Sequence, residues 1–578
     1  MRLLGDCANK ALDYYLRITP PALSAPAAEA FWAAIKAARA SIMALTDHDD
    51  PGSPPRLQFI ADCVAELPKR SGGFGHTSPV TLVPCAYLAS VRATQHDPLL
   101  AERLNQLALR MYTEPAYDAL DLLLDCPLDA YPDVLKVIPT SASALALAAG
   151  LESSSNNRYK TPKKIQAAIY AAVSSTARTR LRAAVMPSPS CTIDHLKAVA
   201  VHVHLITARS QQSRMMAGSM WFDSNVVESK PFVHYSRYYL GLLPLLKPWC
   251  PAIPSTHWEG RQSVCMAGHD MSCILEPGCS HLIACPGSYG ARHAAHERIN
   301  KVFGAFVCEA GAPAILNPST RVMMGDNVSD EAARLLYPKA PSAAAKQRAS
   351  VLQSAFHMAA TSGEGPAKEA AIACIREMTN ACSAKQRGLR VDCIAELPKT
   401  PLWIDVGIIH PEARSKLAQS LAFVRQHDVA ERAGNRANNA FIGKSSPPVQ
   451  AYVSVKDAKY NAMVKEAASQ VGKGTRQHAP VLAACIFSHL GEFSSVAIRT
   501  IEVITLAYRA MAALCYFEDG ISLKRRTAEF RMRFKDALIC ANAAGFGLTI
   551  SQAGKPRAGR TVTSPDANSG LPDWEVLY

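Results

Sequence analysis

The stretch that decides the fold is RVDCIAELPKTPLWIDVGIIHP, residues 390–411, in which two apolar runs flank a Lys-Thr pair bounded by prolines. Each run contains one aspartate, Asp392 in the first and Asp405 in the second. Apolar and β-branched runs on either side of a short proline-containing turn predict two antiparallel strands. A carboxylate buried in such a hairpin is costly unless it is paired or bound to a cation. The hairpin therefore raises the question of what its two aspartates do.

The parity of the turn places the two aspartates relative to each other. With residues 398–401 as a four-residue loop, Asp392 lies opposite Gly407 and diagonal to Asp405, at about 7–8 Å between Cα atoms. Both side chains then share a face, and a bound Mg²⁺ would relieve their repulsion. Such an ion activates water and stabilises the transition state of nucleases. The structural alternative is that Asp392 caps a strand or pairs with Arg390, while Asp405 marks a strand edge.

Two further kinds of group would complete a catalytic site. Glu309, on an apolar helix expected at about 299–318, offers a third carboxylate. Lys456 or Lys459, in the helical segment VKDAKY, offers an ammonium that can hold the attacking water or the leaving oxygen. The alternative for each is an ordinary solvated side chain on a helix surface.

A Cys/His cluster precedes the hairpin at CMAGHDMSCILEPGCSHLIAC, residues 265–285. Thiolates and imidazoles are the usual zinc ligands, and the Pro-Gly pair inside the cluster can supply the turns of a four-ligand site. Buried thiols without a metal are the alternative. The favoured zinc set consists of Cys265, Cys273, His281 and Cys285, with Cys279 as the alternative to Cys265.

The composition is that of a basic globular protein. The chain has 578 residues and a formal net charge of +14, which together with the motifs favours polyanionic partners such as nucleic acid; for the charge alone, a solvated positive surface is the alternative. The segments NNRYKTPKK and TARTRLRAAV fit contacts with a phosphate backbone. No uncharged apolar run approaches the roughly 18 residues of a membrane helix. The 17 cysteines form no paired framework, and the first residues lack a signal-peptide core, so we expect a nuclear or cytoplasmic protein without a membrane contact.

We expect a mainly α N-terminal region followed by an α/β domain with a small mixed sheet and flanking helices. The segment 29–45, EAFWAAIKAARASIMAL, has the apolar spacing of an amphipathic helix. After the hairpin, helices are expected to continue to residue 545. The expected units are a helical region at 1–130, a basic helical region at 131–250, the Cys/His segment at 251–298, the α/β domain at 299–545 with an insertion at about 319–389, and a disordered tail at 546–578.

The order of these motifs resembles the C-terminal region of non-LTR retrotransposon proteins with a restriction-like endonuclease. The resemblance rests on the H-x-x-x-C cluster, the Arg292-His293 pair opening a helix, R-x-D, I-D-V thirteen residues later, His-Pro, and K-x-x-K-Y. Upstream, ELPKRSGGFGHTS and AYLAS look like the segment after the polymerase palm of those proteins. The resemblance covers about residues 1–545 through short motifs in a fixed order.

The resemblance implies a Mg²⁺-dependent endonuclease that nicks target DNA to prime reverse transcription. It makes Asp392 and Asp405 metal ligands, Lys456 or Lys459 the catalytic lysine, and the CCHC set a zinc knuckle. Nucleic-acid contacts are expected from Arg390, Arg292 and His293, with target DNA as the partner and element RNA as a second candidate.

Three features depart from the family pattern. Val391 replaces the expected proline, the insertion before the hairpin is long, and the polymerase palm is missing. The Asp49-Asp50 pair precedes Pro and Gly in a loop, so we expect no polymerase activity from this chain. The alternative is an inactive zinc-knuckle protein that binds nucleic acid, and a helical interaction protein ranks last.

Overall fold

The computed structural model describes residues 11–43, 55–69, 72–94, 162–192, 194–209, 229–242, 249–250, 262–263, 289–318, 391–398, 400–432, 445–469, 478–515 and 522–553, with scattered positions elsewhere. Most of these residues are helical. The helices are α2 (Asp13–Ile18), α3 (Pro21–Ile42), α4 (Pro55–Glu66), α5 (Pro79–Thr94), α10 (Pro162–Val185), α11 (Asp194–Arg209), α12 (Ser229–Tyr239), α14 (Tyr289–Glu309), α19 (Arg414–Arg432), α20 (Pro447–Ser469), α21 (Ser495–Cys515) and α22 (Leu523–Ala553).

Four strands form the main sheet, which is small and mixed as the sequence predicted. They are β3 (Ala314–Leu316), β4 (Cys393–Ala395), β5 (Leu402–Ile409) and β6 (Val481–Ser488), in the order β3-β4-β5-β6. The pairs β3–β4 and β4–β5 are antiparallel, whereas β5 and β6 are parallel over their full length. A separate pair of two-residue strands, β1 (Trp249–Cys250) and β2 (Gln262–Ser263), is antiparallel.

Strand β5 is covered on both faces, which explains its nearly continuous apolar sequence. Leu402, Ile404 and Val406 belong to the main core. On the opposite face, Trp403 packs with Tyr460 of α20 in a second cluster. Because side chains alternate along a strand, Asp405 points to the same face as Trp403, towards α20.

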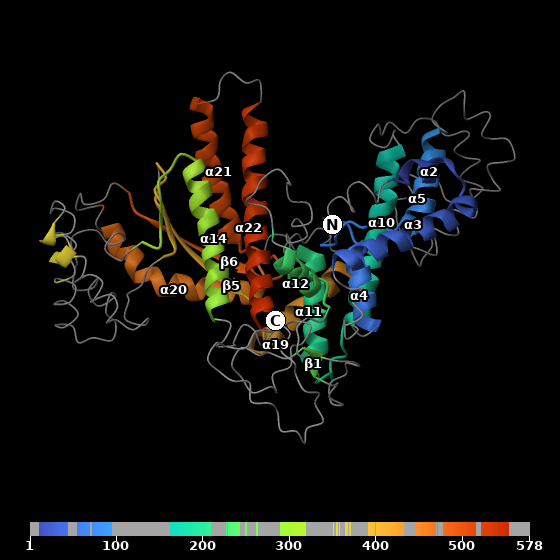
Figure 1. The fold of residues 1–578 in the computed structure, drawn as a ribbon, viewed down its shortest axis with the longest axis horizontal. Coiled ribbons are helices and arrows are strands. Elements are labelled where there is room, and N and C mark those ends of the chain that lie inside the picture. Colours follow the sequence, from blue (N-terminus) through green and yellow to red (C-terminus); the bar gives the residue numbers. More distant parts are fainter. Residues whose placement is uncertain are drawn as a thin grey trace.

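Helices α14, α21 and α22 stand side by side against the sheet (Figure 1). Aromatic side chains join them, since Phe303 and Phe306 on α14 contact Phe534 on α22. The same core continues into the N-terminal helices through residues such as Val64 on α4 and Ile206 on α11. The helical region and the sheet region therefore share one buried core.

The hairpin register differs from the expected one. Ala395 pairs with Leu402 and Cys393 with Ile404, so the connecting loop is two residues longer than predicted. Extending this register puts Asp392 opposite Asp405 and not opposite Gly407. The ladder ends at Ala395 because the Leu397 N–H donates a hydrogen bond to the Ala395 carbonyl oxygen within the loop, so Glu396 and Leu397 do not pair with β5. The loop length stays even, as predicted, but Asp392 lies before β4 and outside the ladder. Val391 packs with Trp403 and Tyr460 on the α20 face, whereas the Asp392 side chain contacts His296 of α14.

Two further elements differ from the sequence prediction. The helix expected at 299–318 ends at Glu309, because Gly311 adopts a positive φ of 77° and strand β3 follows. The region expected to be helical up to residue 545 contains β6, an apolar run whose strand state depends on pairing with β5.

Other expectations concern the helices and the tail. Most of the amphipathic segment at 29–45 lies in α3, as predicted. Helix α22 continues to Ala553, beyond the expected end at 545, and the predicted disordered tail after it lies outside the described residues. No described helix has the length and apolarity needed to cross a membrane.

Candidate active site at the carboxyl side of the hairpin

Asp405 is the buried centre of the candidate site. It lies in the middle of β5 and is only 2% exposed. Its Oδ2 is 2.6 Å from Lys456 Nζ, and its Oδ1 accepts a 2.8 Å hydrogen bond from the hydroxyl of Tyr460. Lys456 and Tyr460 are four residues apart and therefore lie on the same face of α20. One helix thus supplies both partners of this carboxylate.

Burial and charge oppose each other in this pair. Burial raises the pKa of Asp405, and although Lys456 counteracts it, the net pKa stays above its ordinary value; the nearby charge of Asp392 adds to the rise. For Lys456, burial alone would lower the pKa, but the charge and hydrogen bond of Asp405 outweigh it and the net pKa is raised. The lysine is therefore a fixed cation in contact with the aspartate at neutral pH.

Asp392 lies just before β4, where the ladder becomes irregular. Its backbone N–H bonds to the Ile404 carbonyl at 2.9 Å, and its Oδ2 accepts a 2.6 Å hydrogen bond from the Val406 N–H. This is the strand-capping role that the structural alternative described. The same Oδ2 is also 3.2 Å from Nε2 of His296. Asp392 is thus held between the hairpin and α14.

His296 connects α14 to both strands of the hairpin. Its Nε2 lies 3.1 Å from the Val406 carbonyl oxygen as well as 3.2 Å from Asp392. A carbonyl oxygen only accepts hydrogen bonds, so Nε2 carries a proton. Burial lowers the pKa of His296, but the hydrogen bond and charge of Asp392 raise it above the ordinary value on balance.

The structure distinguishes the two candidate lysines. Lys456 contacts Asp405 directly, whereas Lys459 Nζ lies 3.1 Å from the Tyr460 hydroxyl and reaches Asp405 only through it. Burial lowers the pKa of Lys459 on balance. Lys456 therefore fits the role of the catalytic lysine, and Lys459 lies one contact further away.

Gly407 lies where helix α20 comes close to β5. A Cβ atom at this position would lie 2.6 Å from Ile486 Cδ1 and 2.7 Å from Tyr452 Cε1, so no side chain fits there without a shift. Tyr452 is one helical turn before Lys456, whose Nζ lies 5.7 Å from the centre of the Tyr452 ring. Helix α20 thus packs against β5 at a position that leaves no room for a side chain.

Glu309 lies apart from this cluster. It forms an ion pair with Arg533 of α22 at the end of α14, thirteen residues after His296, or about 20 Å along a helix. The acidic residue of α14 next to the cluster is Glu297, whose Oε1 is 3.9 Å from Nδ1 of His296. The predicted third carboxylate therefore does not lie with the two aspartates.

The remaining predicted residues have separate positions. Arg292 and His293 lie in the first turn of α14, with His293 exposed. Arg390 and the predicted zinc ligands Cys265, Cys273, Cys279, His281 and Cys285 lie outside the described residues.

Two contacts were not predicted from the sequence: His296 with Asp392, and the hydroxyl of Tyr460 as a donor to Asp405. His296 follows the Arg292-His293 pair by one helical turn, and Tyr460 is the last residue of the K-x-x-K-Y motif. Helical spacing of three and four residues from these motifs is the signal that could have found them.

The donor set decides which cation the site could hold. Within the described ranges, no three His, Cys, Asp or Glu side chains converge as a metal-binding group. Mg²⁺ commonly takes only one or two protein carboxylates and completes its shell with water and substrate phosphate. Asp392 and Asp405 fit that requirement in kind, whereas they do not fit a cage made of protein ligands alone.

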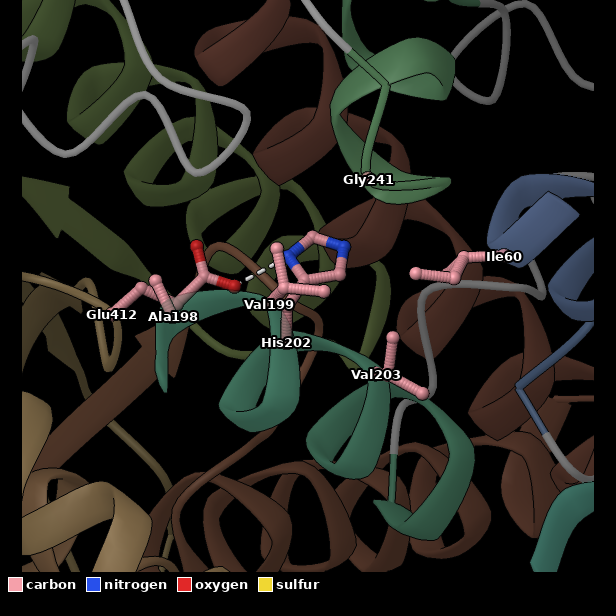
Figure 2. A pocket seen from close by; sticks show the side chains of 7 residues that line it. All are labelled: Ile60, Ala198, Val199, His202, Val203, Gly241 and Glu412. Atoms are coloured by element: carbon pink, nitrogen blue, oxygen red, sulfur yellow. Dashed lines mark hydrogen bonds and ion pairs between the residues drawn. The ribbon is translucent and has the colours of Figure 1, made fainter. Parts of the chain in front are cut away.

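A second polar cluster lies between the helical region and the end of β5. His202 of α11 forms a buried ion pair with Glu412, and its Nε2 lies 2.9 Å from the Tyr239 carbonyl oxygen. Figure 2 shows this pair beside a small hollow, with Ile60 and Gly241 across from it. The side chains of Tyr238 and His410 also approach Glu412. Since these groups bind one another, the cluster serves to join the two regions.

The comparisons with known proteins add no assignment: no family model and no curated protein sequence matches this chain.

Proposed function

We propose that this chain is a Mg²⁺-dependent DNA endonuclease of the retrotransposon type, which nicks target DNA and has no polymerase activity of its own. The observation that carries the proposal is the buried contact of Asp405 with Lys456, near Asp392, the residue before β4, whose Oδ2 accepts from the Val406 N–H. An aspartate pair can hold a divalent cation, and an adjacent lysine can stabilise the negative charge that develops in phosphodiester hydrolysis. The proposal includes a zinc knuckle formed by the Cys/His cluster, target DNA as the substrate and element RNA as a second partner.

Each side chain then has a defined part in the reaction. Asp392 and Asp405 would hold Mg²⁺, which supplies charge stabilisation at the scissile phosphate and a more acidic bound water. Lys456 places a positive charge where the attacking or leaving oxygen develops negative charge. Tyr460 fixes the rotamer of Asp405 through its hydroxyl, and His296 fixes Asp392. DNA would approach through the partly exposed side of Asp392, whose side chain is 16% exposed, because Asp405 itself is buried.

A second candidate function is nucleic-acid binding without catalysis. The observation that favours it is that both oxygens of Asp405 are already engaged, one by Lys456 and the other by Tyr460. A carboxylate closed in this way also serves as a structural ion pair that holds α20 against the sheet. Binding of DNA would then depend on the basic surface and not on Mg²⁺.

Nicking of supercoiled plasmid separates the two functions. The wild type should convert supercoiled to open-circular DNA with Mg²⁺ and not with EDTA, and Asp392→Asn should abolish this conversion. Asp457→Asn is the matched control, because Asp457 is an exposed acidic residue on the same helix α20 next to Lys456. DNA binding by the wild type without nicking would support the second candidate and contradict the endonuclease.

A further inference from the structure

The end of β3 carries an unusual backbone conformation next to Asp392. Among the described residues other than glycine, only Asn317 has a positive φ, of 49°. Asparagine tolerates the left-handed region better than most residues, but the conformation is still uncommon and persists where the surroundings hold it. The strand ends here, and the Asn317 N–H donates a 2.7 Å hydrogen bond to the Asp392 carbonyl oxygen.

The side chain of Asn317 turns back to α14. Its Nδ2 donates a 3.2 Å hydrogen bond to Oε2 of Glu297. Glu297 follows His296 in the sequence, and His296 Nε2 lies 3.2 Å from Oδ2 of Asp392. The contacts therefore close a ring that runs from the main chain of Asp392 through Asn317, Glu297 and His296 back to the side chain of Asp392.

We propose that Asn317 is a positioning residue, which braces α14 against the strand ends through Glu297 and so holds the side chain of Asp392 in the candidate active site. This inference rests on the proposed endonuclease function and deepens it. The backbone and the side chain of Asn317 have separate roles. The left-handed backbone directs the side-chain amide towards α14, and the amide donates the hydrogen bond to Glu297. A purely local turn would need the backbone conformation alone.

Four variants separate these parts. Asn317→Gly removes the amide but keeps the left-handed backbone conformation available. Asn317→Ala removes the amide and also disfavours that conformation. Glu297→Ala removes the acceptor, whereas Glu297→Gln keeps an acceptor oxygen without the charge. The wild type and these variants are compared for plasmid nicking with Mg²⁺, as separate kcat and KM values for DNA, and for urea unfolding.

A brace predicts a specific pattern. Asn317→Gly and Glu297→Ala should each lower kcat by roughly 10–100-fold with little change in KM, as outer contacts of ligands typically do. Glu297→Gln should restore most of the rate, and the double variant Asn317→Gly with Glu297→Ala should be no slower than either single variant. Wild-type rates in Asn317→Gly would overturn the proposal. Equal losses in Glu297→Gln and Glu297→Ala would also overturn it, because they would make the charge of Glu297 the essential feature.

Failure of the endonuclease function is distinguishable from failure of the brace. If the wild type does not nick, the urea unfolding midpoints of the wild type, the two single variants and the double variant still test whether Asn317 and Glu297 interact. Non-additive shifts for Asn317→Gly and Glu297→Ala support the contact, and additive shifts overturn it.

Discussion

Replacing Lys456 by methionine tests the buried ion pair at the centre of the candidate site. Methionine has a similar length and no charge, so the substitution leaves Asp405 buried with only the Tyr460 hydroxyl as a partner. Breaking a buried pair in this way typically costs about 3–5 kcal/mol of the free energy of unfolding. Asp405 can limit the cost by taking up a proton, which requires about 1.36 kcal/mol for each pH unit above its ordinary pKa of 3.8.

This limit makes the expected loss depend on pH. It is at most about 4 kcal/mol at pH 7 and about 2 kcal/mol at pH 5, because a protonated Asp405 needs no cation. Urea unfolding of Lys456→Met and the wild type at both pH values measures the difference. The control is the double variant Lys456→Met with Asp405→Asn, which carries no charge at this site. Its loss of stability should differ little between pH 5 and pH 7. A loss that is the same at pH 5 and pH 7 would refute the reasoning.

Three further changes test other parts of the molecule. Gly407→Ala should lower the free energy of unfolding by about 1–3 kcal/mol, because its Cβ would overlap Tyr452; an unchanged urea midpoint would contradict this close approach. Burial raises the pKa of Glu66 to about 7 from 4.5, so the folded state holds this proton longer than the unfolded chain; stability should fall as pH rises between these values, and Glu66→Gln should remove the slope in unfolding titrations. Burial lowers the pKa of His202, but the charge and hydrogen bond of Glu412 outweigh burial, so the net pKa is raised above 6.5. The contribution of this pair to stability is therefore full below pH 6.5 and is lost as pH rises through the folded pKa. Glu412→Gln should abolish this loss, and a slope that persists in the variant would contradict the pairing.

Local patterns were sufficient for the helices and for the hairpin of the fold. Apolar spacing predicted the helix around Trp32, and apolar, β-branched runs on either side of a proline-bounded turn predicted β4 and β5. Strands β3 and β6 could not be found in this way, because β3 is three residues long and β6 becomes a strand through pairing with a segment about eighty residues earlier. The register also depended on a backbone contact inside the loop, which the turn sequence alone does not specify.

For the candidate site too, features set by neighbouring residues could be predicted from the sequence, whereas contacts between distant segments could not. Parity predicted a shared face for Asp392 and Asp405, but the regular ladder ends before Asp392. The Asp392 side chain contacts His296 of α14 and the Val406 N–H, whereas Asp405 contacts Lys456 of α20. The choice of Lys456 over Lys459 required the position of α20 on the sheet. Glu309 does not lie with the two aspartates, since a helix of 21 residues places its two ends far apart. His296 in its first half contacts Asp392, whereas Glu309 at its end pairs with Arg533.

The proposed endonuclease function is tested most directly by the rate of nicking of supercoiled plasmid by Asp405→Asn against the wild type and Asp457→Asn. The amide keeps the size of the side chain and can still accept from Tyr460, but it removes the charge that Mg²⁺ and Lys456 need. We expect Mg²⁺-dependent nicking by the wild type and by Asp457→Asn, and none by Asp405→Asn. Equal nicking by all three proteins, or nicking by none, would contradict the assignment of Asp405 as a catalytic metal ligand.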